Sequence, residues 1–166
     1  MLTPKLPQQE QGFALTEVLI SLLIISLFIA VTMQATLIAA IFKAKAEQHD
    51  EAITWIQEDL EFVKHQASEY KKNDYPDIAR CNATTANDGL AAGLLSTIGH
   101  TSNPKTIGSR ILGGKDFILT RTAVYDTPSY SFKLLQLTYK VMPLSDNDAI
   151  AMLSTEVIPD AALKCP

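Results

Sequence analysis

Basic residues are scarce in this sequence, and their scarcity excludes one large class of functions. The chain has 14 Lys and Arg against 18 Asp and Glu, giving a formal net charge of −4, and its longest basic cluster is the pair Lys71–Lys72. A protein that binds a nucleic acid backbone normally carries a basic patch or stripe on one face. We therefore expect no direct binding of DNA or RNA.

Residue patterns typical of catalytic and metal sites are missing as well. The two cysteines, Cys81 and Cys165, form no Cys-x-x-Cys pair, so a zinc ribbon or a redox motif is not expected. His49, His65 and His100 are scattered without metal-ligand spacing, and we interpret them as surface histidines. No nucleophile is paired with a base in a known motif. The sequence thus predicts no enzyme, no cofactor and no metal.

Helix breakers and charge are absent from one long stretch. Between Phe13 and Phe42 there is no proline or glycine, and Glu17 is the single formally charged residue. About 20 apolar residues suffice for a helix to cross the hydrocarbon core, so the stretch predicts one transmembrane span. A cleaved secretory signal is the alternative, with Ala44-Lys45-Ala46 as its cleavage site. Its apolar region normally has only about 7–15 residues, which disfavours that interpretation.

A short motif stands where the apolar stretch begins. It reads Gln11-Gly12-Phe13-Ala14-Leu15-Thr16-Glu17-Val18-Leu19-Ile20 behind a polar leader. This motif resembles the signal sequence of type IV prepilins and of type II secretion pseudopilins. The resemblance implies that a prepilin peptidase removes residues 1–12 by cutting after Gly12, and that the new N-terminal residue, Phe13, is N-methylated.

Glu17 is the most unusual residue of the span. A carboxylate in a membrane helix costs roughly 2.5–3.5 kcal/mol on insertion scales, so it is expected to have a partner. The resemblance implies that Glu17 of one subunit meets the freed ammonium of Phe13 on a neighbour during filament assembly. In a wrong axial register the Glu17 carboxylate would be left without this partner, so that register would be less stable. The alternative is that Glu17 merely lies at the headgroup boundary, about 6 Å along the helix from Phe13.

The span departs from the pattern of major pilins. Major pilins often have a proline near the middle of this helix, whereas residues 26–34 contain neither Pro nor Gly. The chain therefore resembles minor pilins and pseudopilins more closely.

A helical pattern continues beyond the span. Apolar residues recur three and four positions apart and form one stripe: Ile53, Ile56, Leu60, Val63, Ala67 and Tyr70. We predict one helix from about Phe13 to Lys72, transmembrane over 13–42 and amphipathic over 43–72, which ends before Asn73-Asp74-Tyr75-Pro76. A coiled-coil partner is one explanation of the stripe, and a sheet that the helix covers is the more common one.

Residues 73–166 are predicted to form a globular region outside the cytoplasm. Residues 77–114 have no sustained period and predict a long loop with one helical turn near 89–96. Gly113-Gly114-Lys115 lacks the pattern of a phosphate loop and predicts a turn. Alternation predicts a hairpin of strands 116–125 and 131–142 around the turn Asp126–Ser129, and a third strand at 154–158. The expected fold class is α+β and pilin-like, a long N-terminal helix packed on a small antiparallel sheet.

A Cys81–Cys165 disulfide is predicted, because oxidised cysteines persist outside the cytoplasm. It would resemble the C-terminal disulfide loop of many pilins while enclosing far more chain. Lysines lie on both sides of the span, so the positive-inside rule does not fix its orientation. The resemblance implies a single-pass inner-membrane protein with a cytoplasmic leader, which later joins a periplasmic or extracellular filament.

Trp55 and Phe62 are seven residues apart and lie on one side of the helix, more than 100° from the centre of the apolar stripe by the helical repeat. We predict that the sheet leaves them uncovered and that they contact a neighbouring subunit. The alternative is that the 77–114 loop covers them.

Two function classes fit the sequence. The first is a filament subunit, a minor pilin or pseudopilin, whose partners are other pilin-like subunits, the prepilin peptidase, the assembly platform and, before assembly, membrane lipid. The second is a membrane-tethered extracytoplasmic binding domain that does not assemble.

Overall fold

A computed structural model describes residues 11–70, 78–125, 132–146 and 148–166. The chain divides into two compact units, one ending at Lys45 and one beginning at Ala46. The long helix α1 (Gln11–Glu69) contributes residues to both. The predicted breakers at 73–76 and the predicted turn at 126–129 lie outside the described residues.

The first unit is the N-terminal part of α1. Its described side chains, from Leu15 onward, are exposed, including the large apolar ones up to Phe42. The hydroxyls of Ser26, Thr32 and Thr36 each donate a hydrogen bond to a carbonyl three residues earlier in the helix, at 2.8 to 2.9 Å. These hydroxyls are thus satisfied within the helix itself, as an apolar surrounding requires.

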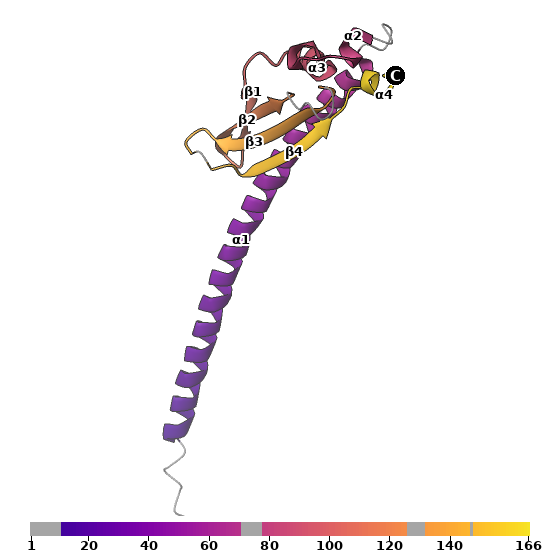
Figure 1. Ribbon diagram of the computed structural model, residues 1–166. Helices are drawn as coiled ribbons and strands as arrows, with labels where there is room; N and C mark the ends of the chain where they lie inside the picture. Colours follow the sequence, from indigo (N-terminus) through magenta and orange to yellow (C-terminus); the bar gives the residue numbers. More distant parts are fainter. Residues whose placement is uncertain (1–10, 71–77, 126–131, 147) are drawn as a thin grey trace, which may run out of the picture. The chain divides into compact units, whose positions relative to one another are not determined.

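The second unit contains a four-stranded antiparallel sheet (Figure 1). Its strands are β1 (Lys105–Leu112), β2 (Lys115–Val124), β3 (Leu135–Pro143) and β4 (Ala151–Val157), and they lie side by side in the order of the sequence. β2 and β3 form the predicted hairpin, in which Leu119 is paired with Val141. The connectivity is a simple meander, so every strand neighbours the strand that follows it in sequence.

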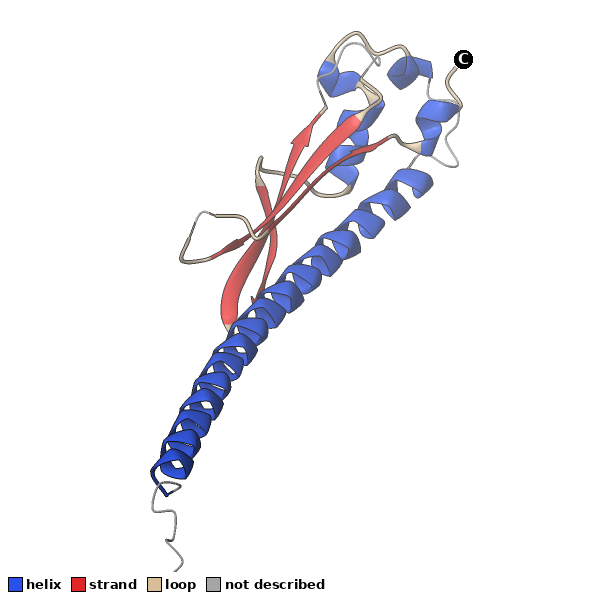
Figure 2. Cartoon of the chain, turned by 90° about the horizontal axis from the view of Figure 1, so that it is seen from below, coloured by secondary structure: helices blue, strands red, loops and turns tan. Residues whose placement is uncertain are grey.

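One face of the sheet packs on the C-terminal half of α1 within this unit (Figure 2). Alternation decides which residues do so: Phe117, Leu119, Leu137, Tyr139 and Val141 are buried, whereas the residues that alternate with them, such as Thr138 and Lys140, are not. The predicted stripe on α1 meets them, with Ile56, Leu60, Val63, Ala67 and Tyr70 all buried and Ile53 partly so. The α+β fold class and the amphipathic half of the helix are therefore as predicted.

The segment predicted as a loop at 77–114 is more structured than expected. It contains the short helices α2 (Ile78–Cys81), η1 (Ala86–Asp88) and α3 (Leu90–Thr97), and then the whole of β1. Only α3 matches the predicted helical turn. A further short helix, α4 (Asp160–Leu163), lies where the sequence predicts a final loop.

The missed strand β1 is joined to β2 by a turn at Gly113 and Gly114. Both glycines have positive φ, 55° and 80°, which is the backbone of a two-residue hairpin turn. A Cβ on Gly113 would lie 2.0 Å from the Gln48 side-chain nitrogen, so any other residue here would also have to displace that side chain. The turn was predicted, but its role in joining two strands was not.

Candidate processing and assembly site

The predicted processing site lies in the first turn of α1. Gly12 and Phe13 both have helical backbone, because the helix begins at Gln11. The bond between them would have to leave helix geometry to enter a protease, and a residue without a Cβ permits this more readily than others do. Residues 1–10 of the predicted leader lie outside the described part of the chain.

Glu17 lies one helical turn further on, exposed on the helix surface beside Thr16, Ile20 and Ser21. Among the described residues of its own chain, no cation is paired with its carboxylate. The neighbouring apolar side chains Val18, Leu19 and Ile20 are all more than half exposed. The helix thus presents one carboxylate on an otherwise apolar surface, with nothing in the described subunit to neutralise it.

The N-terminal helix has the features of a membrane anchor. The N-terminal part of α1 is long and apolar enough to cross a membrane, with a mean hydropathy of 2.5 in its most apolar window, and none of that window is buried. An exposed apolar helix beside the N-terminus fits a single-pass membrane anchor.

The particular signal is identified by comparison with known families. Residues 7–33 match the family model described as the prokaryotic N-terminal methylation motif. The chain therefore carries the type IV pilin-like prepilin signal, as the motif at residues 11–20 predicts. No curated protein and no solved structure matches the chain. The signal and the apolar helix together support a type IV pilin-like subunit.

The two cysteines are joined as predicted. Cys81 at the end of α2 and Cys165 after α4 form a disulfide, with their Cα atoms 5.6 Å apart and the two residues 84 positions apart in sequence. Cys81 is almost completely buried, whereas Cys165 is half-buried. The bond attaches the C-terminal segment to the region that follows α1.

The prediction that Trp55 and Phe62 both lie outside the core is wrong for Trp55. Its side chain is only 5% exposed, and it packs on β1, where the Arg110 guanidinium carbon lies 4.9 Å from the indole centroid. The prediction failed because it omitted β1, which extends the sheet around the helix to this side. Phe62 is 48% exposed and remains a candidate contact for a neighbouring subunit.

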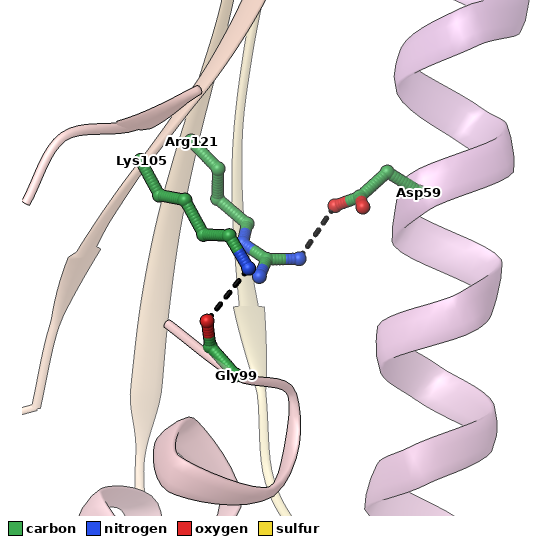
Figure 3. A network of polar contacts seen from close by, with 4 residues as sticks. All are labelled: Asp59, Gly99, Lys105 and Arg121. Atoms are coloured by element: carbon green, nitrogen blue, oxygen red, sulfur yellow. Dashed lines mark hydrogen bonds and ion pairs between the residues drawn. The ribbon is translucent and has the colours of Figure 1, made fainter. Parts of the chain in front are cut away.

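A buried ion pair that no sequence pattern predicted links α1 to the sheet. Arg121 on β2 is 1% exposed, and its guanidinium donates to the Asp59 carboxylate at 2.6 Å (Figure 3). Asp59 lies outside the apolar stripe of the helix, so the helical repeat does not indicate this contact. The sequence does contain one indication of the pair. Arg121 alternates with Leu119 and Ala123 on the inward face of β2, where a charged residue needs a partner.

Two more ionisable groups lie close to this pair. Tyr139 is completely buried opposite Arg121 in the β2–β3 register, and its burial raises the pKa of the phenol far above its ordinary value. His100, predicted to be a surface residue, is instead half-buried, and both of its ring nitrogens are shielded from solvent. His49 and His65 are exposed, in agreement with their interpretation as surface histidines.

Proposed function

We propose that this chain is the precursor of a type IV pilin-like filament subunit, either a minor pilin or a pseudopilin. The observation that carries the proposal is the exposed apolar half of α1, which directly follows the methylation motif and has Glu17 as its solitary carboxylate. An apolar helix with no partner inside its own subunit requires lipid or other such helices around it. Membrane insertion would surround the helix with lipid, and assembly into a filament would then surround it with other apolar helices.

Glu17 is proposed to control the axial register of that packing. Cleavage after Gly12 frees the ammonium of Phe13, which is the opposite charge that Glu17 lacks among the described residues of its own chain. In a low-dielectric surrounding, pairing offsets the cost of desolvating both groups, whereas a shifted register leaves both unpaired. The helix can then slide past its neighbours until the two charges meet.

An accessory place in the filament is favoured over that of the bulk subunit. The helix runs without a break through residues 26–34, where major pilins often carry a proline. We therefore propose a minor pilin or pseudopilin whose role is structural, with no catalytic activity of its own. Its partners would be pilin-like subunits, the prepilin peptidase and the membrane assembly platform.

The proposed topology places the leader in the cytoplasm and the second unit outside it. The Cys81–Cys165 disulfide supports this orientation, because such bonds persist in oxidising compartments and are rare in the cytosol. The subunit would first be a single-pass inner-membrane protein and later part of a periplasmic or extracellular filament.

Mass spectrometry of the mature N-terminus tests the proposal directly. The expected product begins at an N-methylated Phe13. A chain that retains Met1, or one cut near Ala46, would contradict processing as a prepilin. Either outcome would favour the second candidate, a membrane-tethered binding domain that does not assemble. A Gly12→Leu variant should remain uncut because its bulky side chain occupies the protease subsite.

A further inference from the structure

One amide side chain, Gln34, lies within the uncharged part of the N-terminal helix. Glu17 and Lys43 are the charged residues that flank this run, and its middle residue is Ala30. Gln34 is therefore only about 6 Å along the helix from the middle of the run, at 1.5 Å per residue. A hydrocarbon core of about 30 Å centred on the run extends about 15 Å to either side. The Gln34 amide thus lies inside the core, about 9 Å from its nearer boundary.

This amide has no hydrogen-bond partner within the described residues. Gln34 is exposed on the helix surface, and its side chain makes no polar contact with another part of the chain described. The hydroxyls of Thr32 and Thr36 nearby are already satisfied, because each donates to a carbonyl of the same helix. The Gln34 amide has two N–H donors and one carbonyl acceptor, and leaving them unpaired in hydrocarbon is costly.

A second copy of this chain presents a matching group at the same depth. All copies carry the same topology signals and insert with the same orientation, so two neighbouring helices run parallel with both Gln34 side chains at one level. An amide is self-complementary, since each N–H can donate to the carbonyl of the other. Glu17 cannot take this place in a parallel pair, because it lies about 26 Å away along the helix.

The side of the helix around Gln34 is able to pack on a copy of itself. The residues three, four and seven positions away share this side: Leu27, Ala30, Val31, Leu37, Ile38 and Ile41. The large ones are all more than half exposed in the subunit. Ala30, one turn before Gln34, is small and permits a close approach of two helices. Thr36 points to the opposite side, about 200° around the helix from Gln34.

We propose that two copies of the anchored chain pair in the membrane through Gln34, whose side-chain amides exchange hydrogen bonds across a parallel pair of helices. In the filament register proposed above, Glu17 of one subunit meets Phe13 of its neighbour, which offsets the two helices by about 6 Å. The two amides are then no longer level, so the pair belongs to the membrane-inserted state before assembly. The inference rests on the membrane anchor of the proposed function, and on neither cleavage nor assembly.

Energy transfer between donor-labelled and acceptor-labelled chains in vesicles of neutral phospholipid tests the pair. The full precursor, labelled at its C-terminus and reconstituted without other proteins, should show transfer that falls on dilution with lipid. Gln34→Leu keeps the span apolar and removes the amide. Half-maximal transfer should then require about a tenfold higher protein-to-lipid ratio, the usual size of a polar contact between membrane helices.

Thr36→Val is the matched control. It also removes a polar group from the span, but that hydroxyl is satisfied within its own helix and lies on the other side, so transfer should equal that of the wild type. Glu17→Ala should equal the wild type as well. Gln34→Asn, which keeps an amide at nearly the same level, should pair more strongly than Gln34→Leu.

Four results would overturn the proposal. They are a wild-type chain without transfer above that of random neighbours, wild-type transfer in Gln34→Leu, an equal loss in Thr36→Val, and a Gln34→Asn variant as weak as Gln34→Leu. The leader is uncut and no assembly protein is present, so these results are independent of processing at Gly12. A chain that pairs in vesicles but is not cut after Gly12 would keep this inference and contradict the proposed function.

Discussion

The Arg121 guanidinium on β2 and the Asp59 carboxylate on α1 lie 2.6 Å apart inside the core, with the two side chains 1% and 12% exposed. The pair is an inter-element contact between residues 62 positions apart in sequence. A second pair, Arg110 with Glu58, also joins the sheet to the helix at 2.6 Å, but its side chains are about half exposed. The two neighbouring pairs thus allow a buried and an exposed ion pair to be compared in one fold.

Removing the buried charge should destabilise the second unit strongly. Asp59→Asn leaves Arg121 buried without a counter-charge, and such changes cost about 3–5 kcal/mol. The free energy of unfolding of the full chain, measured by denaturant titration, checks this value. Glu58→Gln is the matched control and should have a much smaller effect, because water screens its pair with Arg110. Equal effects of the two substitutions would contradict a special role for the buried pair.

Trp55 and Phe62 should respond oppositely in two assays. Trp55→Ala removes a buried indole, so the free energy of unfolding should fall by about 3–5 kcal/mol. Phe62→Ala should leave the stability nearly unchanged, because its ring is half exposed, but should lower the amount of protein in sheared filaments. Normal incorporation of the Phe62 variant would remove this residue from the candidate subunit interface.

Glu17→Ala should separate membrane insertion from assembly. The apolar span remains intact, so the variant should fractionate with the membrane and be processed normally, yet be nearly absent from filaments because the registering charge is lost. Glu51→Ala, which removes an exposed acid of the second unit, is the control for the loss of one negative charge. Wild-type amounts of the Glu17 variant in filaments would refute the pairing role.

Loss of the disulfide should be measurable as a loss of stability. Replacing both Cys81 and Cys165 with Ser removes a link that encloses a long loop, and the chain-entropy model assigns such a link about 4 kcal/mol. Denaturant unfolding of the double variant, compared with the reduced and the oxidised wild-type chain, checks the value. Two thiols that alkylate readily in protein isolated without reductant would contradict the bond itself.

Alkaline pH should weaken the fold through Tyr139. Burial raises the pKa of this phenol in the folded state, and the Asp59 carboxylate raises it further, whereas the unfolded value is near 10. The stability is therefore intact below about pH 10 and falls as the pH rises above it. Tyr139→Phe should show a shallower fall between pH 9 and 11 in denaturant titrations. Parallel curves for the two proteins would contradict this assignment.

Sequence patterns predicted the elements whose burial alternates regularly. Phe117 and Leu119 on β2, and Leu135, Leu137 and Tyr139 on β3, follow the two-residue period, and both strands were found. β1 was missed because its face residues are mostly exposed or half-buried and because Gly108 and a register shift after Thr106 break the alternation. The two-residue alternation of apolar and polar residues arises because one face of a strand is buried. A strand with few buried residues therefore shows no clear alternation in its sequence.

The residues discussed as candidate functional sites also differ in how far the sequence predicts their surroundings. The prepilin-type signal that includes Gly12, Phe13 and Glu17 could be recognised because it is one local motif, whereas the environment of Asp59 and His100 is made by residues from other elements. Asp59 lies outside the apolar stripe that the helical period defines, and only the position of Arg121 indicates that it faces the sheet. The misplacement of Trp55 has the same origin, since it followed from leaving β1 out of the sheet. Contacts distant in sequence determine these positions, and a local pattern does not contain them.

The Cys81–Cys165 bond also determines how the second unit would carry a mechanical load. All four strands lie between these two residues in the sequence and are thus enclosed in a covalent ring. Tension applied between α1 and the C-terminal end would pass from residue 81 through the sulfur atoms to residue 165 and bypass the sheet. The enclosed chain could not be drawn out by such a pull, so the extension of a stretched subunit would be limited to the segments outside the ring.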